Sequence, residues 1–389
     1  METLDTGIQT KPSAATQASS TWEPVRVGVI GCGVISAAYL RFMAKFPRLR
    51  VVACADLIVA RAEDRAREFS VPRACGPDEL LNDPSVELVL NLTIPQAHME
   101  VSLAALEAGK HVYSEKPLAL DRSDARRLLD TARAKSLRIG CAPDTFLGGG
   151  LQTTRKLVDD GWIGAPVAGT ACMLSHGPEH WHPDPAFLYQ EGAGPLYDIG
   201  PYYLTALVSL LGPVQAVISA NKVTYRQRTI TSEPRYGAVF DVNTPTHVAG
   251  ILEFASGALV TLVTSFDVWN TSTPRLLELY GTQGSLRAPD PNTFAGPVEV
   301  SRAGAETWSE IPLTHGYTEN SRGLGVADMA YAIRSGRAHR TDAALAFHVL
   351  DIMQSLIESA EAGQRVTLAS ACERPAPLPL GLLANTLDA

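Results

Sequence analysis

The sequence predicts a two-domain α/β protein. A doubly wound parallel sheet comes first, and an α+β domain with a large, open and mostly antiparallel sheet follows. Three observations carry this prediction. The chain has 389 residues, more than one ordinary domain uses. Short apolar runs alternate with helical stretches from residue 25 to about residue 143. Beyond residue 150 strand-like runs dominate, and two of them are separated by a tight turn.

The first domain is predicted from this alternation, element by element. Strands are expected at 25–30, 50–56, 88–92, 111–114 and 138–142, with helices at 36–46, 61–69, 97–108 and 123–134. A connection between parallel strands must be long enough to cross the sheet, and a helix is the usual solution. We therefore expect residues 25–143 to form a parallel sheet with helices on both faces, preceded by a polar tail at residues 1–24.

The second domain is predicted at residues 144–370. Helices are expected at 152–160, 324–335 and 343–362, and strands at 167–174, 247–255 and 258–266. The last two strands are separated by Ser256-Gly257, which is typical of a hairpin. These strands are too apolar to leave both faces in water, so we expect a homodimer or homotetramer. The Pro-rich residues 371–389 are expected to be an extended tail.

Composition restricts the classes of partner. The net charge of -8 argues against a nucleic-acid surface. No apolar run reaches the ~18 residues of a membrane span, and the first residues lack the apolar core of a secretory signal. Six cysteines without a C-x-x-C pair suit a reducing compartment. We therefore expect a cytoplasmic protein that binds small molecules and no membrane.

A glycine-rich turn follows the first predicted strand. Gly31 permits a tight turn, Gly33 lets a pyrophosphate approach the backbone, and the following helix directs its N-terminus at the phosphates. Asp56 stands at the end of the second strand, where it can accept from a ribose 2′-hydroxyl and repel a 2′-phosphate. The pattern predicts a Rossmann domain that binds NAD in preference to NADP, although a generic turn with a capping Asp is the alternative. The predicted cofactor-binding residues here are Gly31, Gly33, Val34, Ile35 and Asp56.

Further motifs carry a resemblance to a known family. They are Thr93-Ile94-Pro95 with His98, Glu115-Lys116-Pro117, and the segment G-x-G-P-L-x-D-x-G at 192–200. With the glycine turn and Asp56 they resemble the Gfo/Idh/MocA oxidoreductases, over residues 25 to about 368. The resemblance implies that Lys116 touches both the nicotinamide ribose and the substrate. It also implies that Glu115 and the segment with Thr93, Pro95 and His98 border the cofactor.

The acid/base position departs from the commonest family pattern. In the family an Asp is followed four residues later by the acid/base residue, commonly His, whereas here Asp198 is followed by Tyr202. At the start of one helix both side chains would share a face, and the Lys116 ammonium would bring the phenol pKa nearer the useful range. We therefore predict Lys116, Asp198 and Tyr202 as catalytic and substrate-binding residues. The alternatives are a buried structural Tyr202 and a surface salt bridge at Lys116.

Two further segments carry polar side chains. A loop at 175–184 holds His176, His180, Trp181 and His182, and we predict that the last three bind substrate. Zinc bound by three imidazoles and a plain surface loop are the alternatives; we predict no metal. The run at 320–325 precedes a helix. It either returns polar groups to the substrate cleft or caps that helix through Ser321.

The resemblance implies an NAD-dependent dehydrogenase that transfers a hydride between the nicotinamide and a secondary alcohol of a sugar, sugar derivative or cyclitol. Two alternatives remain open. One is a glycoside-cleaving enzyme that acts through a transient keto-sugar. The other is a non-catalytic protein that senses NAD or sugar, because the acid/base histidine is replaced.

Overall fold

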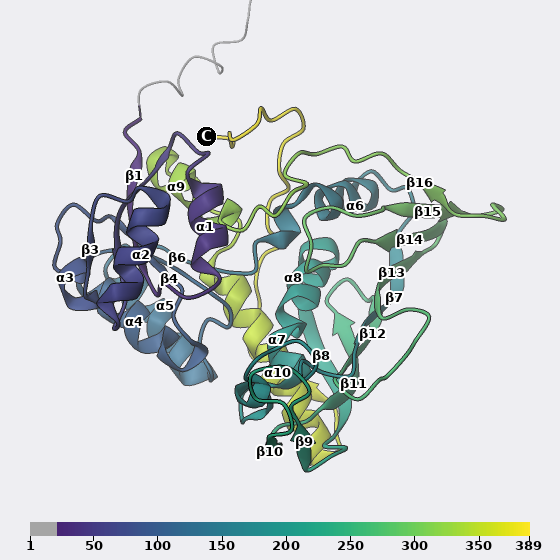
Figure 1. Ribbon diagram of the computed structural model, residues 1–389. Coiled ribbons are helices and arrows are strands. Elements are labelled where there is room, and N and C mark those ends of the chain that lie inside the picture. Colours follow the sequence, from purple (N-terminus) through teal and green to yellow (C-terminus); the bar gives the residue numbers. More distant parts are fainter. Residues whose placement is uncertain (1–21) are drawn as a thin grey trace, which may run out of the picture.

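The computed structural model describes residues 22–389, so nearly all of the tail predicted at residues 1–24 lies outside the described residues. Two sheets dominate the described chain, one of six strands and one of nine, with a small two-stranded ladder beside them. Figure 1 shows the six-stranded sheet with its helices on one side of the molecule and the nine-stranded sheet on the other.

The six-stranded sheet is parallel throughout, with strand order β3-β2-β1-β4-β5-β6. The strand order reverses between β1 and β4, which places a ligand crevice at the carboxyl ends of these strands. The predicted doubly wound sheet is confirmed. Its elements are β1 (Val25–Ile30), α1 (Ser36–Met43), β2 (Leu49–Ala55), α2 (Val59–Phe69), β3 (Ala74–Cys75), α3 (Pro77–Leu81), β4 (Leu88–Asn91), α4 (Pro95–Glu107), β5 (His111–Ser114), α5 (Arg122–Ala134) and β6 (Ile139–Cys141).

Two short elements of this sheet escaped the sequence analysis. Strand β3 has two residues, which pair with Cys54 and Ala55 of β2, and helix α3 has five. Neither is long enough to show a hydrophobic period. Pro77 at the first helical turn of α3 and acidic Asp78 and Glu79 behind it are the local signals that start this helix.

The nine-stranded sheet has the order β16-β15-β14-β13-β7-β12-β11-β8-β17, and β9 pairs with β10 separately. Only β12 and β7 pair in parallel, and the predicted hairpin of β11 and β12 is present. The mostly antiparallel sheet is therefore confirmed. Its strands are β7 (Pro166–Leu174), β8 (Val214–Lys222), β9 (Gln227–Thr229), β10 (Val239–Asp241), β11 (His247–Phe254), β12 (Leu259–Ser265), β13 (Arg275–Gly281), β14 (Gly284–Ala288), β15 (Glu299–Arg302), β16 (Ser309–Glu310) and β17 (Val366–Thr367).

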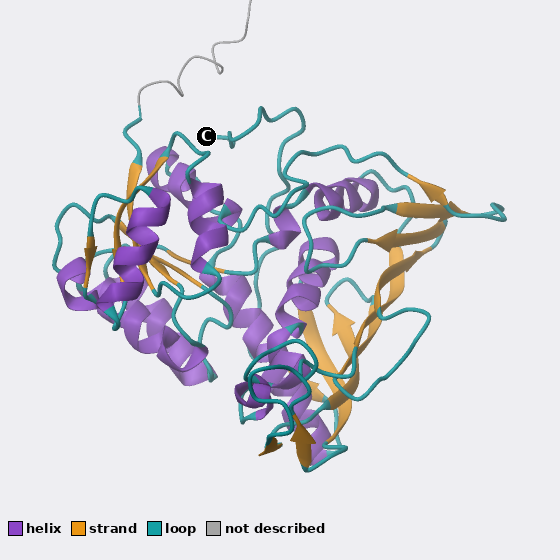
Figure 2. Cartoon of the chain, viewed as in Figure 1, coloured by secondary structure: helices purple, strands orange, loops and turns teal. Residues whose placement is uncertain are grey.

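Helices cover one face of this sheet. In Figure 2 they lie on the side toward the first domain, and the opposite face carries none. The helical elements of this half are η3 (Thr145–Leu147), α6 (Gly149–Asp159), η4 (Pro185–Tyr189), α7 (Gly194–Asp198), α8 (Gly200–Leu211), α9 (Leu324–Ser335) and α10 (Ala343–Ala362). The uncovered face exposes apolar side chains, among them Ile218, Ile251 and Leu259. An apolar face of this kind is typical of a surface that another molecule covers.

The last two helices bring the chain back between the sheets. Helices α9 and α10 have the bounds predicted for them, 324–335 and 343–362. Helix α9 packs against α1 and β6 of the first sheet, whereas α10 packs against β8 of the second sheet and also contacts α5. Within the described chain, no helix combines the length and the apolar character needed to cross a membrane.

The C-terminal residues 371–389 contain no helix or strand. They pack on the protein, because Leu378 and Leu387 are buried and Asp388 accepts a hydrogen bond from Arg340 at 2.8 Å. Figure 1 shows this segment running from the second domain back toward α1 and α9.

Candidate active site

The glycine turn after β1 has the geometry that a dinucleotide requires. Gly31 has a φ of +101°, and a Cβ there would lie 2.6 Å from the backbone of Leu92. A Cβ on Gly33, in contrast, would meet no atom within 4 Å, so the turn leaves open space at this point. The carboxylate of Asp56 accepts from the backbone N–H groups of Cys32 and Ile58, both at 2.9 Å. The turn therefore leaves room for a ligand over Gly33, and Asp56 stands beside the turn.

A cavity of about 600 Å³ is walled by residues of both domains. The first domain contributes the end of the glycine turn, the start of α4 and the segment after β5. The second domain contributes α7, the first turn of α8 and the loop before them. Ten of the predicted site residues line this cavity: Ile35, Thr93, Pro95, His98, Glu115, Lys116, Trp181, His182, Asp198 and Tyr202. Gly31, Gly33, Val34 and Asp56 lie outside it, at the glycine turn.

Lys116 is the link between the two domains at this cavity. Its Nζ donates to the backbone oxygen of Asp198 at 2.7 Å and to Asp198 Oδ1 at 3.0 Å. The same ammonium lies 5.5 Å from the centre of the Tyr202 ring. Burial acts to lower the pKa of Lys116, but the negative charge of Asp198, together with those of Glu115 and of the phenolate that Tyr202 forms at alkaline pH, raises it above its ordinary value. The side chain therefore remains an ammonium across the usual pH range.

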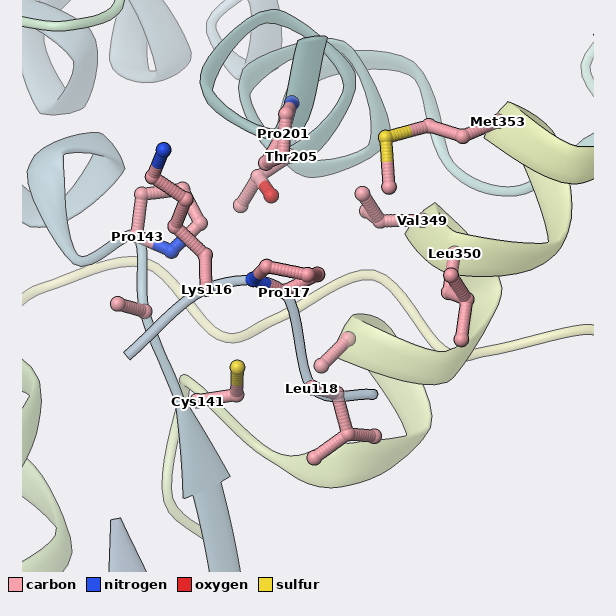
Figure 3. A pocket seen from close by; sticks show the side chains of 12 residues that line it. Lys116, Pro117, Leu118, Cys141, Pro143, Pro201, Thr205, Val349, Leu350 and Met353 are labelled. Carbon is pink, nitrogen blue, oxygen red and sulfur yellow. The ribbon is translucent and has the colours of Figure 1, made fainter. Parts of the chain in front are cut away.

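The backbone around Lys116 is held by apolar packing. Figure 3 shows Lys116 and Pro117 close to Pro201 and Thr205 of α8, with Met353 of α10 on the far side. These side chains enclose a residual cavity of only about 10 Å³. Close packing of this kind leaves little room for movement, so the ammonium is placed by the fold.

Two polar side chains hold the same segment from the other side. His98 places Nδ1 2.7 Å from the Pro117 oxygen and Nε2 3.0 Å from the Thr93 oxygen. Glu115 accepts from the Tyr39 hydroxyl at 2.8 Å and from the Lys116 N–H at 2.9 Å. Both residues line the cavity, and both also fix the backbone from which Lys116 projects.

Asp198 and Tyr202 do not share one helix, which differs from the expectation. Asp198 is the last residue of α7, and α8 begins at Gly200, so Tyr202 lies in the first turn of the next helix. Both side chains nevertheless reach the cavity. The neighbouring Tyr203 does not, because its hydroxyl lies 3.5 Å from Asp290 Oδ1 and the residue is fully buried.

The environment of Tyr202 shifts its pKa in the direction opposite to the one expected. The residue is 8% exposed, and burial raises the pKa of its phenol. Lys116 and Arg322 act to lower that pKa, but burial outweighs them. The hydroxyl is therefore protonated at neutral pH. It can donate readily, and it accepts a proton as phenolate only at alkaline pH.

The His-rich loop is divided between two cavities. Trp181 and His182 line the cavity of Lys116. His180 lies instead against a second cavity of about 660 Å³, together with His176, which stacks on Trp269 with 3.3 Å between the ring centres. His182 is thus separated from His176 and His180, and within residues 22–389 no three His, Cys, Asp or Glu side chains gather as a metal-binding group.

Among the cavity residues that were not predicted as site residues are Arg275, Asn292 and Arg322. The guanidinium of Arg322 donates to Asn320 Oδ1 at 3.1 Å and to Asn292 Oδ1 at 2.9 Å. For Arg322, the sequence offered one signal: it belongs to the polar run at 320–325, which directly precedes an apolar helix. Sequence alone could not tell which of its members would reach the cavity.

The rest of that polar run has a structural role. Ser321 does not cap α9, because its hydroxyl donates to the Glu319 oxygen. The capping group is Asp144, whose Oδ2 accepts from the N–H groups of Gly323 and Gly325 at 2.8 and 3.0 Å. Burial raises the pKa of Asp144 to about 6, against the lowering effect of these two N–H groups. The backbone beside Arg322 is therefore anchored to the segment that follows β6.

Comparison with known proteins gives matches to both domains. Residues 25–142 match the model of an oxidoreductase family with an NAD-binding Rossmann fold, and residues 151–287 match the Gfo/Idh/MocA C-terminal domain. The chain is 26% identical over 291 residues to 1,5-anhydro-D-fructose reductase from Ensifer adhaerens, which covers 74% of this chain and 83% of that relative.

Two other similarities are more limited, one in the length that it covers and the other in sequence identity. Inositol 2-dehydrogenase/D-chiro-inositol 3-dehydrogenase from Lactiplantibacillus plantarum is 31% identical over 152 residues, which is 36% of this chain and less than half (42%) of that relative. The structure of levoglucosan dehydrogenase in complex with NADH superposes with a TM-score of 0.76 at 22% identity, covering 90% of this chain and 100% of that chain. The last likeness shows a shared fold.

Together, the two matched domain models, the parallel sheet with its glycine turn and the large open sheet lead to one conclusion: the chain belongs to the Gfo/Idh/MocA family of oxidoreductases and carries its NAD-binding Rossmann domain.

Proposed function

We propose that this protein is an NAD-dependent dehydrogenase that acts on a secondary alcohol of a sugar, sugar derivative or cyclitol, or on the matching ketone. The observation that carries the proposal is the convergence of Lys116, Asp198 and Tyr202 on one cavity that begins at the glycine turn. The names of two relatives, an anhydrofructose reductase and an inositol dehydrogenase, support this class of substrate.

The bound nicotinamide would supply the hydride chemistry. The protein's part is to orient the carbinol and to manage the hydroxyl proton. Lys116, which remains cationic, would donate to the substrate oxygen and stabilise the alkoxide that forms as hydride leaves. Tyr202 would exchange the proton with that oxygen, and Asp198 would hold the ammonium in place.

A screen of NADH production across sugars, sugar derivatives and cyclitols, with purified protein, tests the proposal. We expect turnover with at least one polyol and none without it. Binding of NAD with no turnover on any compound would favour the sensing alternative. Release of an aglycone from glycosides without net NADH would favour the glycoside-cleaving alternative.

The cofactor preference is expected to depend on Asp56. Its carboxylate would accept from the ribose 2′-hydroxyl of NAD and repel the 2′-phosphate of NADP. We expect calorimetry to show tighter binding of NAD than of NADP, and Asp56→Ala to reduce that difference. Asp64→Ala is the control, because Asp64 is an exposed carboxylate of α2 paired with Arg67. Tighter binding of NADP to the unmodified protein would contradict the assignment.

The uncovered face of the nine-stranded sheet is expected to form a subunit interface. Ile218, Ile251 and Leu259 expose apolar surface there, and covering it removes that surface from water. Sedimentation at micromolar concentration should give a dimer or tetramer, and Ile251→Lys should shift it toward the monomer. A monomer for the unmodified protein would refute the expectation.

A further inference from the structure

We propose that Arg322 binds an anionic group of the substrate, so that the natural substrate is an acidic sugar derivative, such as an aldonic or uronic acid. The inference rests on the proposed function and narrows its substrate class. Arg322 belongs to the polar run at 320–325, whose role the sequence left open.

The cations that line the cavity differ in their partners. Lys116 pairs with Asp198 at 3.0 Å, and Arg275 pairs with Asp290 at 3.3 Å. Arg322 also lines the cavity, but in the described part of the chain it forms no ion pair. Its two hydrogen bonds go to the neutral amide oxygens of Asn292 and Asn320. A guanidinium that is partly removed from water costs free energy unless an anion compensates it.

The carboxylates near Arg322 are already engaged elsewhere. Glu115 accepts from Tyr39 and from the Lys116 N–H, and Asp144 accepts from the two glycine N–H groups that open α9. Asp144 is also almost completely buried and does not line the cavity. Glu319, which lines a neighbouring hollow with Arg322, pairs with Lys45, and Asp290 pairs with Arg275. A ligand can therefore supply the close negative charge that Arg322 lacks.

The guanidinium is prepared for such a ligand. A guanidinium has five N–H donors in a plane, which matches a carboxylate in a two-point contact. The two asparagine contacts use one donor on each terminal nitrogen, so further donors remain. Asp144 fixes the adjacent backbone through Gly323 and Gly325, which limits the loss of freedom when a ligand binds.

The position of Arg322 determines how far the anionic group of the substrate would lie from the reacting carbon. Its charge acts on the Tyr202 phenol, as does that of Lys116, so the three groups surround the same part of the cavity. A carboxylate on Arg322 would hold the substrate with a nearby hydroxyl facing Lys116 and Tyr202. The acid group and the reacting hydroxyl should therefore lie a few bonds apart.

The test compares matched acidic and neutral compounds on the NAD-loaded protein. Glucuronate is compared with glucose, galacturonate with galactose, and gluconate with sorbitol, by kcat/KM and by calorimetric affinity. We expect the acid to be favoured by about 10²-fold or more in at least one pair, as a charge-assisted two-point contact allows. Arg322→Gln should remove that preference, and Arg322→Lys should retain part of it.

The control is Arg287→Gln, because Arg287 is a half-exposed arginine paired with Glu278 and Glu299 and does not line the cavity. It should leave the acid preference intact. Equal affinity for acid and neutral partners, or a preference that survives Arg322→Gln, would overturn the inference. So would a tenfold loss of NAD affinity in Arg322→Gln, since the guanidinium would then serve the cofactor's phosphates.

Binding also separates this inference from the proposed function. Acid binding that depends on Arg322, without turnover of any compound, would support the anion site and refute the dehydrogenase. Turnover of neutral sugars, with no acid favoured over its neutral partner, would support the dehydrogenase and refute the anion site.

Discussion

Lys116→Ala should lower turnover by more than about 10³-fold while the protein stays folded. The change removes the ammonium that stabilises the alkoxide, a contribution worth about 10²- to 10³-fold for a single donor. It also removes a positive charge that lowers the pKa of Tyr202, and leaves Asp198 without its 3.0 Å partner. Because the losses act on the same reacting oxygen, we expect them to reinforce one another.

The measurements are kcat and KM with the best substrate, NAD affinity by calorimetry, and thermal unfolding. Affinity for NAD should also fall, since the resemblance to the family implies contact between Lys116 and the nicotinamide ribose. Lys156→Ala is the matched control, because Lys156 pairs with Asp160 on α6 outside the cavity. Turnover within threefold of the unmodified protein in Lys116→Ala would refute the assigned role.

Tyr202→Phe should lower turnover by about 10²- to 10⁴-fold and leave NAD affinity nearly unchanged, because only proton transfer is lost. Burial holds the pKa of this phenol above its ordinary value. The base form is the phenolate, so the rate of alcohol oxidation in the unmodified protein should keep rising with pH through the neutral range. That slope should disappear in Tyr202→Phe.

Two comparisons test this assignment. Tyr203→Phe removes a neighbouring hydroxyl that points to Asp290 and should change turnover little. His182→Ala and His180→Ala examine the competing base. His182 lines the cavity, whereas His180 faces the second one. If Tyr202→Phe keeps full turnover and His182→Ala loses it, the base lies on the His-rich loop. If all three keep it, the proton leaves through Lys116 or water.

The sequence alone was sufficient for the features that depend on neighbouring residues. The glycine turn and Asp56 were recognisable because a strand, a turn and a helix follow one another within about thirty residues. The bounds of α9 and α10 were predicted from the helical pattern of the sequence, and in the structure Gly336 and Gly363 end these helices. Short β3 and α3 were missed because two and five residues hold no period.

The tertiary structure decided how distant side chains meet. Lys116 and Asp198 are 82 positions apart in the chain, and their contact depends on the packing of α8 and α10 beside the segment after β5. The sequence also could not show that the His-rich loop divides between two cavities, or that Arg322 alone of the cavity's cations lacks a carboxylate among the described residues.

The pKa of Tyr202 illustrates why the tertiary structure was needed to describe the site. From the sequence, the ammonium of Lys116 was expected to lower it, because a pairwise charge effect can be anticipated once two groups are known to meet. Desolvation is different, since it depends on every atom that replaces water around the phenol, and here it prevails. Motifs made of neighbouring residues can be recognised from the sequence. The burial of a side chain, and with it the strength of the charge effects on its pKa, depends on the whole fold.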